Sequence, residues 1–377
     1  MRIGILTHRL FTNYGGILQN YALQVVLKRL GHDVITIDYV VGIPTKIKLL
    51  SFVKRLFLRI LKKEKLPLRA WMTDEESAYI SQFTRNFIQN YINLTKRISL
   101  AEINNLNYDF DCIIVGSDQV WRYNYFKKNI EEFFLKSFDN VPLKLSYAAS
   151  FGTDIWEMPK EQTSICRNLV QKFKSVSVRE QSGIDLCNKY LGVPAELVLD
   201  PTLLLSKDDY VDLIKDINLS LSNSPLMTYI LDKSEDKRNI IQYISEKMGL
   251  EVLEILPDKS FSQVGAKGLD KCIVPQIEYW LKGFLNSEFV VTDSFHGTVF
   301  SIIFNKPFIV IGNKLRGLDR MNSLLNIFNL EDRLVLSYDD LLNKNIKDIK
   351  WDDVNEKLSI WKSKSMCFIK QNLNENV

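Results

Sequence analysis

Cysteine is scarce in this chain, and its five positions are scattered: Cys112, Cys166, Cys187, Cys272 and Cys367. Their odd number and the absence of any Cys-x-x-Cys pair exclude a disulfide framework and a cysteine-based zinc site. Long apolar runs are absent too. Residues 2–7 are too few for a signal-peptide core, and no run approaches the roughly 18 apolar residues of a membrane span. These absences predict a protein of the reducing cytoplasm.

Neither charge nor histidine is in excess. The 49 basic and 45 acidic residues give a net charge of +4. This charge is too weak to indicate nucleic-acid binding, although it is compatible with anionic substrates or an anionic membrane surface. The chain has three histidines, and no cluster of His, Asp and Glu has the spacing of metal ligands. We therefore expect no nucleic acid, no metal and no cofactor.

Apolar strands alternate with helical stretches along the whole chain, which predicts an α/β protein with parallel sheets. A polar run at 218–225 separates two such halves. We therefore expect two Rossmann-like, doubly wound domains facing across a cleft, at 1–217 and 218–350. The segment 351–377 has a helical period, and a return onto the first domain is one arrangement that the pattern allows.

The most informative stretch is 288–304, where a buried strand, a polar turn and an apolar helix follow one another. His296 is then expected at a helix N-terminus, where backbone N–H groups and the helix dipole favour an anion. A structural histidine is the alternative. Asp293, Ser294 and His296 cannot readily form a hydrolase triad, because all three lie on one turn and Gly-x-Ser-x-Gly is missing.

Other predicted strands also end in polar turns. The glycines of Asn13-Tyr14-Gly15-Gly16 allow a ligand or a second backbone to approach closely, or they only make the turn. Asp118, after the strand at 110–115, is a candidate acid, base or helix cap. Arg179, after the strand at 175–178, would clamp a phosphate or carboxylate, unless it pairs with Glu180 or another acid. A basic cluster follows the strand at 307–311: Lys314, Arg316 and Arg320.

Residues 46–69 have a different composition, with bases throughout and Glu64 as the only acid. Their apolar residues recur at helical spacing, which predicts a basic amphipathic helix. Two interpretations stay open. The helix either packs on its own domain or docks on a membrane surface.

Five ordered motifs resemble those of the polysaccharide pyruvyl transferase family, over nearly the whole chain. They are Asn13-Tyr-Gly-Gly-Ile-Leu-Gln19, Gly116-Ser-Asp-Gln-Val-Trp121, Val176-Ser-Val-Arg-Glu180, Asp200-Pro-Thr202 and Thr292-Asp-Ser-Phe-His-Gly297. The resemblance implies a fold like that of GT-B glycosyltransferases. It also implies transfer of pyruvate from phosphoenolpyruvate onto two hydroxyls of a sugar, as a ketal.

By this resemblance, His296 matches the histidine of the family's Arg-Leu-His pattern, and Arg179 matches a donor-binding arginine. Ser294 stands where that pattern has its arginine, and we expect Arg316 or Arg320 to substitute. The predicted catalytic residues are His296 and Asp118. The predicted substrate-binding residues are Asn13, Tyr14, Gly15, Gly16, Ser117, Arg179, Ser294, Gly297, Arg316 and Arg320.

The expected acceptor is a sugar of a surface polysaccharide, including one carried on a lipid diphosphate at the inner face of the cytoplasmic membrane. The basic segment 46–69 would then contact that surface. Two rival functions remain on the same architecture: a GT-B glycosyltransferase that uses a nucleotide sugar, and a glycan-binding module without activity.

Overall fold

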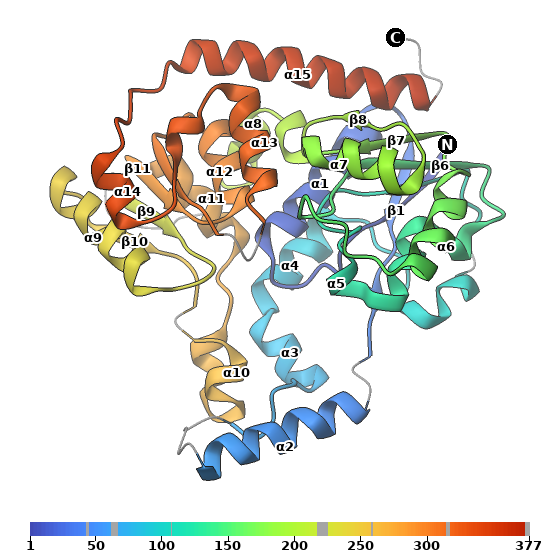
Figure 1. Ribbon diagram of the computed structural model, residues 1–377, viewed down its shortest axis with the longest axis horizontal. Helices are drawn as coiled ribbons and strands as arrows, with labels where there is room; N and C mark the ends of the chain where they lie inside the picture. Colours follow the sequence, from blue (N-terminus) through green and yellow to red (C-terminus); the bar gives the residue numbers. More distant parts are fainter. Residues whose placement is uncertain are drawn as a thin grey trace.

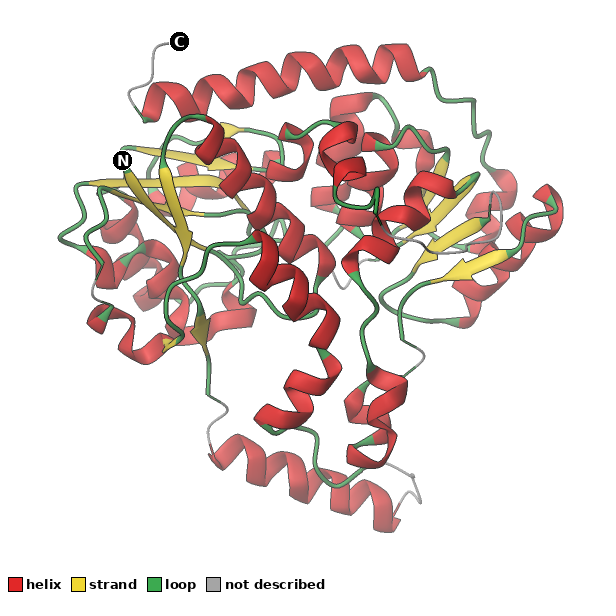
Figure 2. Cartoon of the chain, turned by 180° about the vertical axis from the view of Figure 1, so that it is seen from behind, coloured by secondary structure: helices red, strands yellow, loops and turns green. Residues whose placement is uncertain are grey.

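The computed structural model describes residues 1–42, 45–61, 67–106, 108–216, 225–257, 259–313 and 317–373. These residues form two α/β units, each built on its own parallel sheet (Figure 1). Figure 2 shows the two sheets from behind, each surrounded by helices. The prediction of two Rossmann-like, doubly wound domains is confirmed. The predicted boundary between residues 217 and 218 lies outside the described residues.

The N-terminal unit has a six-stranded sheet in the order β2-β1-β5-β6-β7-β8, and every pairing is parallel. The central strand β5 is apolar throughout and buries all four of its residues, as expected of a strand whose sheet is covered by helices on both faces. A two-stranded parallel pair, β3-β4, accompanies the sheet. The strands are β1 (Arg2–Leu6), β2 (Asp33–Thr36), β3 (Tyr39–Val40), β4 (Ile98–Ser99), β5 (Cys112–Val115), β6 (Leu143–Ala149), β7 (Ser175–Val178) and β8 (Glu196–Leu197).

The C-terminal unit has a five-stranded parallel sheet in the order β10-β9-β11-β12-β13. The stretch predicted as a core strand, residues 289–292, is β11 at the centre of this sheet. The strands are β9 (Leu226–Tyr229), β10 (Val252–Glu254), β11 (Phe289–Thr292), β12 (Phe308–Ile311) and β13 (Leu334–Val335).

Helices connect the strands and cover the sheets. In the N-terminal unit they are α1 (Tyr14–Arg29), α2 (Thr45–Leu61), α3 (Asp74–Ile80), α4 (Gln82–Tyr91), α5 (Tyr123–Phe126), α6 (Lys160–Val170), α7 (Gln181–Leu186) and α8 (Lys207–Asp212). The later helices are α9 (Glu235–Met248), α10 (Phe261–Val264), α11 (Ile277–Asn286), α12 (Phe295–Ile303), α13 (Asp319–Phe328), α14 (Tyr338–Asn343) and α15 (Trp351–Asn372). The short helix η5 (Pro201–Leu204) follows β8.

Helix α15 returns from the C-terminal unit onto the N-terminal unit, as Figure 1 shows along the top of the molecule. Ser365 Oγ accepts a hydrogen bond from the backbone of Leu199 at 2.9 Å, and the carbonyl of Asn372 accepts one from Lys174 Nζ at 2.9 Å. One hydrophobic cluster contains buried residues of both units, including Leu23, Phe300 and Phe368. The two units therefore share a core.

Helix α2 lies apart from both sheets, beside α3 and α10 in both views. None of its residues is buried. Arg55 Nη1 fastens it by donating to the carbonyls of Pro67 and Ser262, at 2.9 and 3.0 Å. The helix predicted over 46–69 is longer than the observed one, because α2 ends at Leu61 and residues 67–69 are not helical. Pro67 lacks the N–H that a helix interior needs, and residues 62–66 lie outside the described part of the chain.

Candidate active site

A pocket between the two units lies where both sheets reverse their strand order. In the N-terminal sheet the order reverses between β1 and β5, and in the C-terminal sheet it reverses between β9 and β11. Open α/β sheets bind ligands in the crevice at this switch point. The pocket is lined by the loops after these four strands and by the start of α13, with Asn13, Asp118, Leu231, His296 and Arg320 as contributors.

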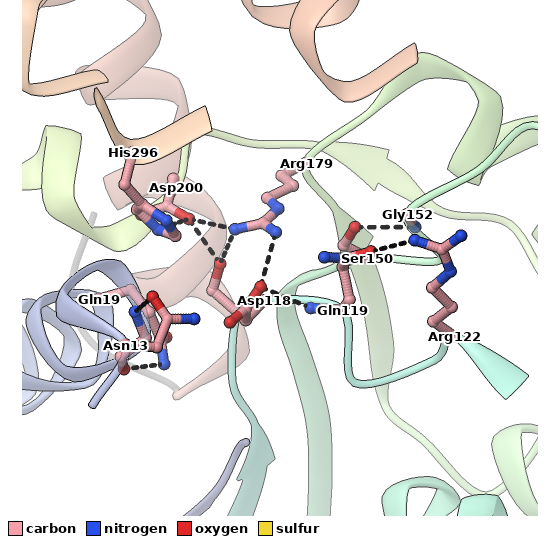
Figure 3. Close-up of polar contacts among 12 residues, drawn as sticks. Asn13, Gln19, Asp118, Gln119, Arg122, Ser150, Gly152, Arg179, Asp200 and His296 are labelled. Carbon is pink, nitrogen blue, oxygen red and sulfur yellow. Dashed lines mark hydrogen bonds and ion pairs between the residues drawn. The ribbon is translucent and has the colours of Figure 1, made fainter. Parts of the chain in front are cut away.

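Asp118 faces this pocket from a strained backbone. Its φ is +79°, a left-handed conformation that a residue with a Cβ adopts at a cost and that is concentrated at functional sites. Its Oδ1 accepts hydrogen bonds from the backbone of Gln119 at 2.9 Å and from Arg179 Nη2 at 3.1 Å (Figure 3). The loop therefore points a held carboxylate into the pocket.

Arg179 contacts Asp118 but does not itself line the pocket. Its side chain is 1% exposed, and Nη1 donates to Asp200 Oδ2 at 2.7 Å. The guanidinium also packs on the ring of Phe295, 4.5 Å from the ring centroid. The alternative that the sequence left open for Arg179, an ion pair with an acid, is therefore observed, with Asp118 and Asp200 as the acids. Substrate binding by Arg179 stays a prediction, and in this structure Arg179 holds two carboxylates in place.

Asp200 is the centre of the hydrogen-bond network. Besides Arg179, its carboxylate accepts bonds from Ser117 Oγ at 2.7 Å, Thr202 Oγ1 at 2.7 Å and the Thr202 backbone at 3.1 Å. His296 Nε2 lies 3.7 Å from Asp200 Oδ2. Asp200 thus connects the N-terminal unit to the histidine that α12 of the C-terminal unit presents.

The electrostatics keep both carboxylates ionised. Burial alone would raise the pKa of Asp118, but His8, Arg179, His296 and Arg320 together hold this pKa well below its usual range. Burial likewise opposes ionisation of Asp200, and His296, Arg179 and Thr202 hold its pKa far below the usual range. Burial would lower the pKa of Arg179, yet Asp118 and Asp200 raise it above its ordinary value.

His296 stands in the first turn of α12, as predicted. Ser294 is the N-cap, and its Oγ accepts a hydrogen bond from the backbone of Gly297 at 3.4 Å. Gly15 of α1 makes room for the imidazole, because a Cβ at position 15 would come within 2.0 Å of His296 Nδ1. Gly15, the first glycine of the Asn13-Tyr-Gly-Gly turn, therefore allows His296 of the C-terminal unit to pack closely against α1.

Arg320 is a second buried guanidinium at the pocket. It is 8% exposed, lines the pocket, and lies 5.8 Å from the centroid of the Phe295 ring, so that Phe295 contacts both Arg179 and Arg320. Burial and the charge of Arg179 lower the pKa of Arg320 to about 10, so it remains a cation at neutral pH. The other proposed substitute, Arg316, lies outside the described residues, as does Lys314.

The remaining predicted residues divide between the pocket and the packing. Asn13 lines the pocket and caps α1. Tyr14 does not line the pocket, which corrects its assignment: it is fully buried, and its hydroxyl donates to the carbonyl of Pro275 at 2.8 Å. Gly16 faces Asp118 Oδ2, whereas Gly297 allows close packing on Thr292. Ser117 is fully buried against Asp200 and Arg179.

Asp293 also lines the pocket, but its carboxylate is committed to the fold. It accepts from the backbones of Leu231 and Asp232, at 2.7 and 3.1 Å, and pairs with Lys237 Nζ at 2.6 Å. These contacts fix the loop after β9 to the start of α12. Among the residues that the structure describes, no group of His, Cys, Asp and Glu could hold a metal ion.

Sequence reasoning missed the roles of Asp200 and Phe295. Asp200 belongs to one of the motifs that carry the family resemblance, Asp200-Pro-Thr202, and this was the available signal. Its four hydrogen bonds depend on how β7, β8 and the Asp118 loop come together. For Phe295, no sequence pattern distinguishes a residue of the apolar helix from one that supports two arginines.

Comparison with solved structures shows the fold class. A UDP-N-acetylglucosamine 2-epimerase aligns with 99% of this chain and 95% of its own, at a TM-score of 0.51 and 10% identity. The UDP-GlcNAc 2-epimerase of Methanocaldococcus jannaschii, solved with UDP-GlcNAc and UDP, aligns with 99% of both chains at a TM-score of 0.49 and 12% identity. At such identities the likeness concerns the GT-B-type fold alone. A search among curated protein sequences finds no match.

The family follows from the sequence itself. Residues 13–314 match the model of the family named Polysaccharide pyruvyl transferase. This range begins at the N-cap of α1 and includes Asp118, Arg179, Asp200 and His296. The chain belongs to the polysaccharide pyruvyl transferase family, and it is a transferase that acts in polysaccharide pyruvylation at the level that the family defines.

Proposed function

We propose that this protein transfers pyruvate from phosphoenolpyruvate to two hydroxyls of one sugar in a surface polysaccharide or its lipid-linked precursor. The observation that carries the proposal is the meeting of His296, Asp118 and Arg320 in one pocket of a chain of this family. Phosphoenolpyruvate has a phosphate and a carboxylate, and its binding needs fixed cations and N–H donors. Arg320 and the N-terminus of α12 supply them.

The reaction needs one proton donor and groups that position the sugar. Protonation of the methylene carbon of phosphoenolpyruvate gives an oxocarbenium-like centre at C2, which the first sugar hydroxyl attacks with loss of its proton. The C2–O bond to phosphate then breaks, and the second hydroxyl adds to C2 with loss of its proton. The products are the cyclic ketal and inorganic phosphate. Of the two protons that the hydroxyls lose, one replaces the proton consumed in the first step and the other goes to the leaving phosphate.

In this proposal His296 donates the proton or holds the phosphate, and Asp118 accepts a hydrogen bond from the attacking hydroxyl. The low pKa of Asp118 makes it a weak base. A weak base is sufficient here, because an oxocarbenium-like centre is attacked without prior removal of the hydroxyl proton. The negative charge of Asp118 also stabilises the positive charge that develops at C2.

In this proposal, Arg320 takes the role of the arginine that the family's Arg-Leu-His pattern has at the position of Ser294. Ser294 lines the pocket with a short side chain, and Arg320 lines the same pocket from α13. We expect Arg320→Gln to raise the KM for phosphoenolpyruvate about 10- to 100-fold, the effect of losing a hydrogen bond to a charged group of about 1.5–3 kcal/mol. His296→Ala with intact folding should abolish turnover. Full turnover in His296→Ala would contradict its assignment.

The decisive experiment is incubation of the protein with phosphoenolpyruvate and a panel of glycans that includes galactosides. Phosphate release together with a pyruvyl mass increment on one glycan supports the proposal. Release of a nucleotide from a nucleotide sugar would instead support the glycosyltransferase alternative. Binding of a glycan without turnover of either donor would support the non-enzymatic alternative.

We further propose that α2 brings the enzyme to an anionic membrane surface, where a lipid-diphosphate-linked acceptor is presented. Nine large apolar residues between Ile47 and Leu61 are at least 37% exposed. The helix carries Lys46, Lys48, Lys54, Arg55 and Arg59 and no acid. A packing helix would bury its apolar face, whereas an interfacial helix leaves it free for lipid. No described helix has the length and apolarity needed to cross a membrane.

Vesicle sedimentation tests this contact. Each lysine near an anionic surface contributes about 1 kcal/mol, so Lys46→Gln, Lys48→Gln and Lys54→Gln together should weaken binding to phosphatidylserine-containing vesicles on the order of 100-fold. The matched control is Lys357→Gln, Lys364→Gln and Lys370→Gln on α15, which should bind as the unmodified chain does. Equal sedimentation of all three proteins would refute the membrane contact.

A further inference from the structure

A second cavity lies on the N-terminal unit, outside the catalytic pocket. Its volume is about 570 Å³, against about 70 Å³ for the catalytic pocket measured in the same way. Ligand sites of proteins generally fall between about 300 and 1,000 Å³. The second cavity is therefore large enough for a ligand of its own, whereas the catalytic pocket is smaller.

Three arginines line this second cavity, which we call the arginine pocket: Arg9, Arg85 and Arg97. Two carboxylates line it as well. Asp38 Oδ2 accepts from Arg97 Nε at 2.8 Å, and Asp74 is close enough to affect the pKa of Arg9. The guanidinium of Arg85 has no ion pair or hydrogen bond with another described residue. The arginine pocket therefore retains a net positive charge.

Two of these arginines, Arg9 and Arg97, also repel each other. Burial and then the charge of Arg97 lower the pKa of Arg9, and Arg9 is held over the ring of Phe11, 5.0 Å from the ring centroid. Like charges brought together in a partly buried cavity are unfavourable until an anion neutralises them. All three arginines are exposed residues, in contrast to Arg179, whose guanidinium is buried among carboxylates. The arginines are thus accessible to a ligand.

The arginine pocket and the catalytic pocket lie at the same edge of the N-terminal sheet. The arginine pocket is built on the segments that follow β1 and β2, and Asp118 follows β5, the other neighbour of β1. The chain runs from Arg9 in one pocket to Asn13 in the other within five residues. Asp74 and Arg85 belong to α3 and α4, the helices that lie between the sheets and α2 in Figure 1.

We propose that the arginine pocket binds the phosphate or diphosphate group of the acceptor, and so selects a glycan that is still attached to its carrier. The inference rests on the proposed function for the identity of the reaction, and it names the acceptor class. The anion would lie between the membrane surface at α2 and the catalytic pocket, while the sugar reaches Asp118. Guanidinium groups bind phosphate oxygens bidentately, and they favour phosphate esters over neutral glycans.

Calorimetric titration of the full chain with inorganic pyrophosphate tests the site without need of the acceptor. Arg9→Gln together with Arg85→Gln should weaken pyrophosphate binding 10- to 100-fold and leave the Kd for phosphoenolpyruvate within twofold. Arg320→Gln should instead weaken the binding of phosphoenolpyruvate and leave pyrophosphate binding within twofold. The matched control, Arg2→Gln with Arg238→Gln at exposed positions, should change neither. Absence of pyrophosphate binding, or its loss in Arg320→Gln alone, would overturn the proposal.

A kinetic arm separates an acceptor phosphate from a free anion. One glycan is offered as its polyprenyl diphosphate and as its methyl glycoside. Arg9→Gln with Arg85→Gln should raise the KM of the diphosphate form at least 10-fold and leave that of the methyl glycoside unchanged. If both KM values stay unchanged while pyrophosphate binding is lost, the pocket takes a free anion and the acceptor assignment is wrong. Lack of turnover by the unmodified chain would count against the proposed function, and the titration would still decide the anion site.

Discussion

Replacement of Asp200 by asparagine removes one negative charge from the centre of the site and preserves the size of the side chain. Asp200 Oδ2 accepts from Arg179 and Ser117, and Oδ1 accepts twice from Thr202. An asparagine has one acceptor oxygen and one NH₂ group. Either orientation of the amide therefore places a donor against a donor, at Arg179 or at the Thr202 backbone.

The cost follows from the burial of the pair. The side chains of Arg179 and Asp200 are 1% and 0% exposed, and removal of one partner from a buried ion pair costs about 3–5 kcal/mol. Because the hydrophobic core continues through both units, unfolding is expected to be cooperative. With a urea m-value of about 3 kcal/mol/M, the unfolding midpoint should fall by about 1–1.7 M.

Urea unfolding followed by circular dichroism measures this shift, with Asp33→Asn as the matched control. Asp33 also pairs with an arginine, Arg2, at 3.1 Å, but the two side chains are 66% and 50% exposed, and such a pair contributes about 0–1 kcal/mol. If Asp200→Asn loses no more stability than Asp33→Asn, the buried network does not stabilise the fold, and this reasoning is refuted.

The remaining predictions concern pH and the contacts between the two units. The pKa values of Asp118 and Asp200 are depressed by folding, so their stabilisation is complete above the unfolded value of about 4 and is lost as pH falls below it; the acid limb of a stability profile should flatten in Asp200→Asn. Gly15→Ala should lower kcat about 100-fold by displacing His296, whereas Gly42→Ala, with open space around its Cβ, should leave kcat unchanged. Tyr14→Phe should cost about 0.5–1.5 kcal/mol in urea unfolding and leave KM unchanged, because the hydroxyl bonds the backbone outside the pocket.

Sequence reasoning succeeded where the signal is local. The stretch at 288–304 carries an apolar strand, a serine cap and an apolar helix in consecutive residues, and the structure has β11, Ser294 as N-cap and α12 at these positions. The alternation of strands and helices predicted both sheets, because the hydrophobic pattern of a β-α-β unit is visible within a few tens of consecutive residues.

Sequence reasoning failed where the contact joins distant segments. Nothing near Gly15 indicates that its missing Cβ makes room for the imidazole at position 296. Tyr14 belongs to a polar, glycine-rich turn, yet its ring packs against Tyr229 and Trp280 of the other unit. Arg179 follows a buried strand, and the acids that occupy its guanidinium are fixed by the tertiary arrangement. Asn13 and Tyr14 are thus neighbours in one turn, yet Asn13 lines the pocket and Tyr14 belongs to the packing between the units.

The candidate active site is complete only because the two units are in contact. Asp118, Arg179 and Asp200 come from the N-terminal unit, and His296 and Arg320 come from the C-terminal unit. Further contacts fix this arrangement: Ser323 Oγ accepts from the backbone of Gln181 at 2.9 Å, and Gly317 lies so close to the carbonyl of Gly152 that a Cβ would reach within 2.0 Å of it. A separation of the units that admits an acceptor would also take His296 away from Asp200 and Phe295 away from Arg179. The predicted catalytic groups therefore meet only while these contacts hold, and we expect a substrate that touches both units to stabilise this arrangement.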